Sequence, residues 1–395
     1  MRDVALNFTL EEYQTRLSKV RQQMVAQHID ILIVHDPSNM SWLTGYDGWT
    51  FYVPQCVVLS LEGDPIWFGR QQDANGALRT VYMDDEHVTS YPEYYIMNPP
   101  IHPMEFLADS VLPQRSWDKG RIGVEKDNYY FSATAYEALV THLPKAQLTD
   151  ATGLVNWCRA IKSPQELIFM SKAARIAENI HRVAMELIEP GLPKHHLVAE
   201  LNRQSILGHD TDYGDYAAIV PLLPSGSDAA APHLTWNDKP FKRGEGTFFE
   251  IAGVYRRYHC PLSRTIFLGE PSDKFKHADE ALRMGIEAGL AAAKPGNTCA
   301  DIANALQNVL EKANISRSGA RCGYPIGISY PPDWGERTMS LRENDHTVLQ
   351  EGMTFHFMPG MWFDDWGLET TESIVITSKG AETLCHYPRE LLVKQ

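Results

Sequence analysis

Over roughly the first 150 residues, stretches with apolar residues at helical spacing alternate with short apolar runs. Between Leu10 and His28, apolar side chains recur at helical spacing among charged ones, which predicts an amphipathic helix. Helices alternating with strand-like runs predict a small α/β domain with a largely covered sheet. The elements that we expect here are helices at 10–28 and 131–142, a turn at 36–39, and strands at 29–35, 55–61, 64–68, 122–124 and near Leu148.

The pattern then changes, and a long helix is expected to begin at Ser163-Pro164. Ser163 is a suitable N-cap, Pro164 fits the first helical position, and Glu166 stands where the second residue of a capping box would be. Apolar positions continue at helical spacing to Ile188. We therefore place a domain boundary at the start of this helix. The expected domains are residues 1–161 and 162–395.

The second half of the chain continues with helical and strand-like segments. Helices are indicated where apolar positions follow the helical period, and strands where β-branched and aromatic residues form short runs. The expected helices are a short connecting one at 155–161 and longer ones at 195–207, 273–293 and 299–314. The expected strands are 216–220, 246–255, 264–268, 353–358 and 372–377.

Length and charge narrow the classes of function. A chain of 395 residues is longer than a typical single core, so two domains are the natural expectation. The formal net charge of −14 argues against binding to nucleic acid or to an anionic membrane surface. The N-terminus lacks the apolar stretch of a signal peptide, and no run reaches the ~18 apolar residues of a membrane span. We therefore expect a cytoplasmic protein.

The six cysteines do not form a recognisable pattern. They are spread over the chain, and none belongs to a CxxC pair. This distribution favours buried or incidental thiols in a reducing compartment over a disulfide framework or a zinc site. The cysteines are Cys56, Cys158, Cys260, Cys299, Cys322 and Cys385.

Several segments after Lys162 resemble, in order and at matching separations, the pita-bread family of methionine aminopeptidases, prolidases and creatinase. KSPQELIFMSKAARIAE resembles the helix that opens their catalytic domain, and LLPSGSDAAAPHLTW resembles the strand and loop that carry a family histidine, here His233. Arg264-Thr265, Gly323 with Gly327, and Pro359-Gly360 also match. The resemblance implies an α/β (α+β) protein, with a creatinase/prolidase-like N-terminal α/β domain (1–161) followed by a pita-bread catalytic domain (162–395).

The metal-binding positions of this family are changed in this chain. Metal-dependent members bind two divalent ions through two Asp, one His and two Glu. The positions that resemble these ligands hold Glu250, Pro261, Tyr324, Met358 and Thr371. Divalent ions prefer several oxygen or imidazole ligands, which this set does not supply. We therefore expect no catalytic metal and no other cofactor, as in the metal-free hydrolase creatinase.

Glu250 and His233 are the expected catalytic residues. Glu250 lies on a predicted strand between apolar residues, where a carboxylate is costly unless a partner or a substrate charge compensates it. It would attack an electrophilic carbon or act as a general base towards water; the alternative is a structural ion pair, for example with Arg264. His233 matches the family histidine, which in creatinase resembles a proton shuttle; the alternative is an ordinary loop residue.

Four further residues are candidates for substrate binding. Tyr324 should face the cavity that a metal-binding histidine occupies elsewhere in the family, either as a hydrogen-bond donor or as simple filling. Glu369 and Glu372 offer a second carboxylate; on a regular strand, Glu369 shares a face with Thr371 and Glu372 faces away. Arg264 would bind a substrate carboxylate. His259, in a predicted turn, and His356, beside the altered position 358, are weaker candidates.

A run of aromatic residues lies in the N-terminal domain, in the segment NMSWLTGYDGWTFY. Packing at a domain or subunit seam explains most of them. In creatinase-like dimers, the N-terminal domain of one subunit covers the pocket of the other. The resemblance therefore implies a homodimer in which Trp49 and Tyr52 stack on a cationic substrate.

The resemblance and the remaining side chains together indicate the substrate class. A pocket with carboxylates, a histidine and aromatic rings suits a small cation with a planar C–N unit. The segment FFEIAGVYRRYHCPLSRT and the chain length are more similar to family hydrolases that open a cyclic amidine bearing a carboxylate than to creatinase. We expect metal-independent hydrolysis of such an amidine. The alternatives are hydrolysis of the guanidinium of creatine, and a non-catalytic member that binds a small solute or a protein.

Overall fold

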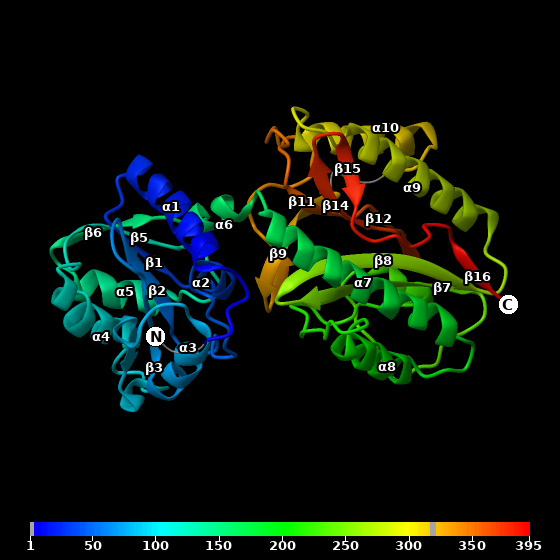
Figure 1. The fold of residues 1–395 in the computed structure, drawn as a ribbon. Coiled ribbons are helices and arrows are strands. Elements are labelled where there is room, and N and C mark those ends of the chain that lie inside the picture. Colours follow the sequence, from blue (N-terminus) through cyan, green and yellow to red (C-terminus); the bar gives the residue numbers. More distant parts are fainter. Residues whose placement is uncertain (1–3, 317–320) are drawn as a thin grey trace. The chain divides into compact units, whose positions relative to one another are not determined.

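The structure is a computed structural model that describes residues 4–316 and 321–395. The chain divides into two compact units, residues 1–158 and 159–395, and each has its own sheet and its own apolar core (Figure 1). Both units mix helices and strands, which confirms the expected fold class.

The first unit is built on a six-stranded sheet in the order β4-β3-β2-β1-β5-β6. β1 pairs antiparallel with β2 and parallel with β5, and all four of its residues are buried, so both faces of the sheet are covered. The strands are β1 (Ile31–Val34), β2 (Cys56–Ser60), β3 (Ile66–Arg70), β4 (Val88–Tyr91), β5 (Gly120–Val124) and β6 (Ala146–Asp150). The helices are α1 (Leu10–Ala26), α2 (Pro37–Thr44), α3 (Ala74–Thr80), α4 (Pro103–Phe106) and α5 (Ala133–His142), with α6 (Leu154–Arg159) at the boundary.

The elements of this unit follow the apolar pattern closely. Alternate side chains of β1 and β2, such as Ile33 and Val58, enter the cluster that α4 and α5 complete, while α1 covers the other face (Figure 1). The turn expected at 36–39 is wrong. Asp36 is instead the N-cap of α2, and its Oδ1 accepts from the backbone N–H of Ser38 at 2.7 Å. Asp-Pro occurs at the start of helices as well as in turns. Here the residues after Pro37 continue as the helix α2.

The second unit contains an eight-stranded sheet with the path β15-β14-β11-β9-β8-β16, in which β7 pairs with β8 and β10 with β9; β12 and β13 form a separate pair. Its strands are β7 (Glu245–Tyr255), β8 (Tyr258–Leu268), β9 (Gly323–Tyr330), β10 (Asp333–Gly335), β11 (Thr354–Phe357), β12 (Gly360–Trp362), β13 (Gly367–Glu369), β14 (Glu372–Thr377), β15 (Gly380–Thr383) and β16 (Leu392–Lys394). Its helices are α7 (Pro164–Leu187), α8 (Lys194–Leu207), α9 (Asp273–Ala292) and α10 (Cys299–Lys312).

The long helix α7 has the predicted capping box. The Ser163 side chain accepts from the N–H of Glu166, and the Glu166 carboxylate accepts from the N–H of Ser163 at 2.8 Å. α7 lies against the hairpin of β7 and β8 (Figure 1). The approach is so close that a Cβ on Gly253 would lie 2.1 Å from the carbonyl oxygen of Ala173. α9 and α10 lie side by side and share a core with β11 and β14.

Two expectations for this unit are wrong. Residues 216–220 are irregular; the segment just after them pairs with β7 instead, through bridges from Leu222 to Glu250 and from Ser225 to Thr247. The turn between β7 and β8 is Arg256-Arg257, where both residues have positive φ. His259 is therefore a buried β8 residue, and its Nε2 accepts from the N–H of Ala218 at 2.9 Å. The sequence predicted a turn at His259 because the start of β8 contains polar side chains, although the whole strand is buried.

Candidate active site

Glu250 lies in the middle of β7 and is only 5 % exposed. β8 pairs with it on one side through Ser263, and Leu222 exchanges two backbone hydrogen bonds with it on the other. The backbone is therefore fixed on both sides. Its carboxylate oxygen Oε1 lies 3.8 Å from Nδ1 of His356. Burial, and next the charge of Glu369, raise the pKa of Glu250 well above its ordinary value of 4.5.

Glu369, at the end of β13, provides a second buried carboxylate and is 1 % exposed. Its backbone is held by Thr265 of β8. The Thr265 hydroxyl donates to the carbonyl oxygen of Glu369 at 2.8 Å, and the N–H of Glu369 lies 2.9 Å from the same hydroxyl. Two buried carboxylates that interact through their charges favour either a shared proton or a bound cation.

Beside the two carboxylates runs a chain of hydrogen bonds. His356, on β11, has Nδ1 3.0 Å from the Tyr324 hydroxyl and Nε2 2.8 Å from the Thr371 hydroxyl. The indole N–H of Trp334 donates to the Tyr324 oxygen at 2.8 Å, and the N–H of Ser263 donates to the Thr371 oxygen at 2.8 Å. The four side chains and the backbone N–H of Ser263 come from five separate segments, and the hydrogen bonds fix their positions.

The imidazole of His356 is neutral in this environment. Burial, and next the charge of Arg321, lower the pKa of His356 to about 3. A neutral ring has one donor and one acceptor. If Nδ1 carries the proton, it donates to the phenol oxygen of Tyr324, and the phenol O–H is then free to donate into the site. Burial, and next the charge of Glu250, raise the pKa of Tyr324 well above its usual value, so Tyr324 keeps its proton.

The residues at the altered metal positions do not fit a dinuclear metal centre. Pro261 has no donor atom, Met358 offers only a thioether, and the oxygens of Tyr324 and Thr371 are engaged with His356. Only Glu250 of the five is a carboxylate. Among residues 4–316 and 321–395, no three His, Cys, Asp or Glu side chains converge as they do around a metal ion.

Arg264 and Glu372 belong to a different network from Glu250. The guanidinium of Arg264 donates to Glu372 at 2.7 Å and to the carbonyl oxygens of Ser263, Thr371, Tyr387 and Pro388. Glu372 also accepts from Arg389 at 2.7 Å. The alternative that paired Arg264 with Glu250 is wrong, and Glu372 faces away from Thr371 as strand alternation predicts. Because protein groups already occupy the donors of Arg264, we assign it a structural role.

His233 lies in the exposed loop after the 3-10 turn Gly226–Ala230. That turn packs against β7 and β13, the strands of Glu250 and Glu369. A Cβ on Gly367 of β13 would lie 2.0 Å from the carbonyl oxygen of Ala229, so the two backbones touch. Among the described residues, His233 has no hydrogen-bond or ion-pair partner. Its role as a proton shuttle stays a prediction.

Trp49 and Tyr52 of the first unit are 58 % and 61 % exposed. The ring of Trp49 packs on Phe51 with centroids 4.7 Å apart. Large aromatic rings exposed together on a loop are available to a partner or a ligand. Their expected place over the pocket of a partner subunit stays a prediction.

The sequence did not predict the roles of three residues of the site. His356 was a weaker candidate, although a histidine between Phe355 and Phe357 on a buried strand was a signal. The sequence around Trp334 carries no signal for a place in the site. The third residue is Arg321, which is exposed. Its guanidinium lies over the Tyr324 ring, 4.6 Å from the centroid. Nothing in the local sequence of Arg321 indicates this stacking.

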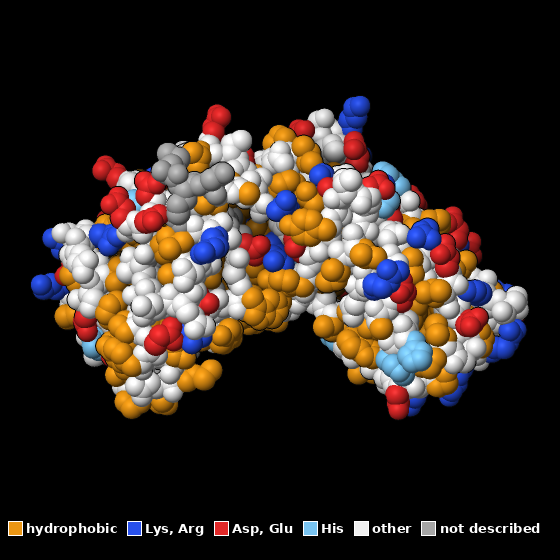
Figure 2. Space-filling model, turned by 60° about the horizontal axis from the view of Figure 1, so that its bottom comes forward, with side chains coloured by type: hydrophobic (Ala, Val, Ile, Leu, Met, Phe, Trp, Pro, Cys, Tyr) orange, Lys and Arg blue, Asp and Glu red, His pale blue; other side chains and the backbone are white. Residues whose placement is uncertain are grey.

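The surface and the helices add little to the choice of function. On the face of each unit that Figure 2 shows, acidic and basic side chains lie interspersed among apolar ones. Within the described part of the chain, each helix falls short of the length or hydropathy needed to cross a membrane. All six cysteines are free thiols.

Comparison with known proteins places this site in a family. The model of metallopeptidase family M24 matches residues 169–378, and the model of the creatinase/prolidase N-terminal domain matches residues 16–161. The chain is 60 % identical over 399 aligned residues, covering all of both proteins, to a protein of Halomonas elongata named ectoine hydrolase. It is 24 % identical to an Xaa-Pro dipeptidase of Lactobacillus helveticus, over 95 % of this chain and 98 % of the relative.

Solved structures agree on the fold. Prolidase from Thermococcus sibiricus superimposes with a TM-score of 0.83 at 17 % identity, over 96 % of this chain and 99 % of the other. A dipeptidase from Mycobacterium ulcerans gives 0.81 at 20 % identity, over 98 % and 99 %. Since the M24 model alone spans more than half of the sequence, the chain belongs to the metallopeptidase M24 family, with a creatinase/prolidase N-terminal domain.

Proposed function

We propose that this protein is a metal-independent hydrolase that opens the ring of ectoine, a cyclic amidine that carries a carboxylate. The single observation that supports this most is the buried pair of carboxylates, Glu250 and Glu369, beside a neutral His356. The full-length 60 % identity to a protein named ectoine hydrolase supports the same substrate.

The charge of the site suits an amidinium. Two carboxylates in a buried place cannot both ionise without compensation, so the empty site holds a proton. A substrate cation supplies the missing charge, and Glu250 then ionises. A planar amidinium has N–H groups on two sides of its central carbon, so one carboxylate holds a nitrogen while the other reaches the carbon. Glu369 takes the first role and Glu250 the second.

The reaction adds one water across a carbon–nitrogen bond. Oxygen becomes bonded to the amidine carbon, the bond from that carbon to one ring nitrogen breaks, and the nitrogen leaves as an amine after gaining a proton. The products of ring opening are the amide and the amine of one molecule, N-acetyl-2,4-diaminobutyrate. Glu250 acts at the carbon by one of two routes: it removes a proton from the attacking water, or its oxygen bonds to the carbon first.

A single turnover in ¹⁸O-labelled water distinguishes the two routes. Attack by water puts the label into the amide oxygen in that first turnover. Attack by Glu250, followed by hydrolysis at the glutamyl carbonyl, gives an unlabelled amide and leaves the label in the Glu250 carboxylate. Mass spectrometry of the product and of the peptide that contains Glu250 reads both outcomes.

The other side chains have supporting roles in this proposal. His233 donates the proton to the departing nitrogen. Tyr324, held by His356 and Trp334, donates a hydrogen bond from its phenol O–H to the substrate. Arg321, an exposed residue whose guanidinium stacks on the Tyr324 ring, binds the substrate carboxylate.

The protein is further proposed to be a cytoplasmic homodimer, in which Trp49 and Tyr52 of one subunit stack on the substrate of the other. The exposure of these two rings and the six free thiols support the proposal. Light scattering gives the mass of the assembly, and a Trp49→Ala variant that leaves the KM for ectoine unchanged would contradict the stacking role.

Turnover of ectoine is expected to survive removal of metal ions. Purified protein dialysed against EDTA should retain its full rate, because the altered ligand positions leave only one carboxylate of the five. NMR follows product formation from ectoine, with creatine in a parallel sample. Loss of activity that zinc or manganese restores would contradict metal independence. Binding of ectoine without any product would indicate a non-catalytic member, and faster turnover of creatine would reverse the choice of substrate.

Replacing His233 by alanine is expected to lower kcat for ectoine by roughly 10²-fold, the usual contribution of a general acid. Because His233 is exposed, added imidazole should reach the vacated position and restore part of the rate. The matched control is His195→Ala on α8, which should leave the rate unchanged with or without imidazole. A His233→Ala variant with the wild-type kcat would remove His233 from the mechanism.

A further inference from the structure

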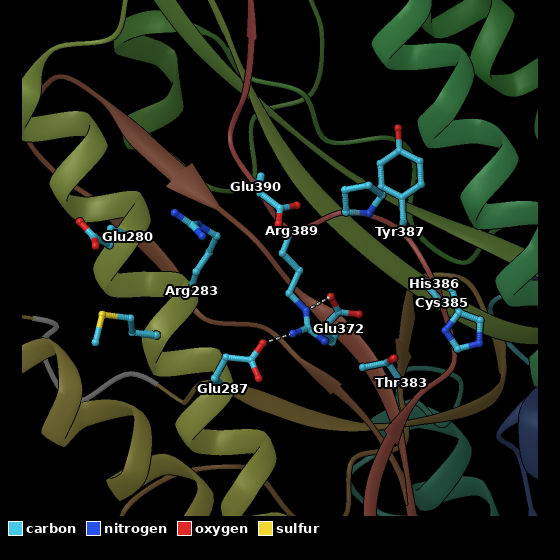
Figure 3. A pocket seen from close by; sticks show the side chains of 12 residues that line it. Glu280, Arg283, Glu287, Glu372, Thr383, Cys385, His386, Tyr387, Arg389 and Glu390 are labelled. Atoms are coloured by element: carbon cyan, nitrogen blue, oxygen red, sulfur yellow. Dashed lines mark hydrogen bonds and ion pairs between the residues drawn. The ribbon is translucent and has the colours of Figure 1, made fainter.

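A groove lies on the second unit between α9 and the segment Thr383–Glu390 (Figure 3). It has a volume of about 570 Å³. A second cavity of about 600 Å³ shares Glu287, Thr383, His386 and Arg389 with it, so the two form one continuous groove. Neither cavity is lined by Glu250, His356 or Tyr324. The groove is therefore separate from the candidate active site.

Three arginines line the groove, and all are already paired. Arg175 pairs with Glu178 at 2.9 Å. Arg389 points from the C-terminal segment to Glu372 and to Glu287 (Figure 3). Arg283 donates to Asp279, one turn away on α9, at 2.9 Å. By contrast, the exposed carboxylates of Glu280 and Glu390 make no hydrogen bond or ion pair with any residue that the structure describes. The lining therefore has an excess of negative charge.

The floor of the groove supplies an independent sign of a ligand. The side chain of Glu372 is 1 % exposed, and its Oε1 accepts from Arg264 and Arg389. Its other oxygen, Oε2, is buried and has no hydrogen-bond partner among the described residues. A buried carboxylate oxygen without a donor is costly. A donor inside the groove would remove that cost.

These observations indicate the chemistry of the ligand. The ligand must be positively charged to match the carboxylates, and it must carry N–H donors to reach the unsatisfied oxygen. A metal ion does not fit, because no three potential ligand side chains converge anywhere in residues 4–316 and 321–395. Ammonium and guanidinium groups satisfy both conditions, because each combines a positive charge with several N–H donors.

We propose that this groove is a second binding site, for a small organic cation that bears an ammonium or guanidinium group. Glu280 and Glu390 attract the cation at the rim, and Oε2 of Glu372 accepts a hydrogen bond from it at the floor. The groove is also linked to the active site. Glu372 follows Thr371, the hydrogen-bond partner of His356, and Arg264 binds both Glu372 and the carbonyl oxygen of Thr371.

The test is a ligand-observed NMR titration with propylammonium and with methylguanidinium as probes, and with acetate as the anionic comparison, all at one ionic strength. The full chain is used in the Glu250→Gln background, which weakens competing binding in the active site. Saturable binding of at least one cation and none of acetate is expected. The double substitution Glu280→Gln/Glu390→Gln should raise its Kd roughly tenfold or more.

The matched control is Glu311→Gln/Glu343→Gln, which removes the same two charges from exposed positions outside the groove. It should leave the Kd unchanged. An equal loss of affinity in both double variants would reduce the effect to net charge and overturn the proposal. Absence of saturable cation binding, or tighter binding of acetate, would overturn it as well. None of these outcomes depends on whether ectoine is the substrate.

Discussion

The Glu250→Gln variant is expected to lose at least about 10²-fold in kcat for ectoine, the lower end of what a positioned base contributes, and to unfold at a higher temperature than wild type at pH 8. Activity falls because glutamine can neither accept a proton nor attack the carbon. Stability rises because glutamine has nearly the same shape but no charge to bury.

The gain in folding stability of Glu250→Gln should depend on pH with a definite sign. The pKa of Glu250 is higher in the folded protein than in the unfolded chain, where it is near 4.5. Below that value both states hold the proton, and the carboxyl group costs nothing. As the pH rises, the unfolded chain releases its proton first, so folding stability is progressively lost up to the folded pKa. The stability advantage of Glu250→Gln should therefore grow from pH 5 to pH 8.

Differential scanning calorimetry without substrate, at several pH values, measures the difference in Tm between the variant and wild type. Glu311→Gln, an exposed change on α10, is the control and should give no pH-dependent difference. A Tm difference that shrinks as the pH rises would show that Glu250 is ionised and compensated in the empty site. Full catalytic activity of Glu250→Gln would remove the residue from the reaction.

The Glu369→Gln variant is expected to shift the acid limb of the pH profile of kcat/KM to lower pH. The charge of Glu369 raises the pKa of Glu250, so its removal lets Glu250 ionise more easily. The pKa of Glu250 should stay above 4.5, because burial is the larger cause of its shift. The same variant should raise KM about tenfold or more, since a hydrogen bond to a charged partner is lost.

Initial rates between pH 5 and pH 9 at varied ectoine concentrations give both quantities. An unchanged acid limb would mean that Glu369 does not act on Glu250 through its charge. An unchanged KM would mean that Glu369 does not hold the amidinium. Glu343→Gln serves as the control, because it removes an exposed carboxylate and should alter neither quantity.

Local sequence signals were sufficient for most of the fold. The capping box at Ser163 and the apolar period after it located α7 to within one residue at its C-terminal end. The signals failed where one motif serves two structures, as Asp36-Pro37 does at the start of α2. They also failed at Tyr216–Val220, where β-forming residues lie beside β7 without joining the sheet. Pairing with a distant strand decides such segments, and local propensity does not.

The candidate site was only partly accessible from the sequence. Glu250, Tyr324 and Glu369 were named because they occupy or adjoin positions at which the family binds metal. The hydrogen bonds that hold Tyr324 come from His356 and Trp334, whose proximity is set by the pairing of β9, β10 and β11. The hydrogen-bond partners of Arg264 could not be predicted for the same reason. An arginine beside an altered metal site suggests substrate binding, but its partner Glu372 and the carbonyl oxygens around it became visible only in three dimensions.

The bonds made by Arg264 also bear on how the protein is synthesised. Its guanidinium is satisfied by the carbonyl oxygens of Tyr387 and Pro388, which follow it by 123 and 124 residues, and β16 pairs with the β8 segment that Arg264 belongs to. A nascent chain that has emerged only as far as β15 therefore has a buried cation short of acceptors and an unpaired sheet edge. During translation, this unit therefore cannot close completely before residues 387–394 have been synthesised.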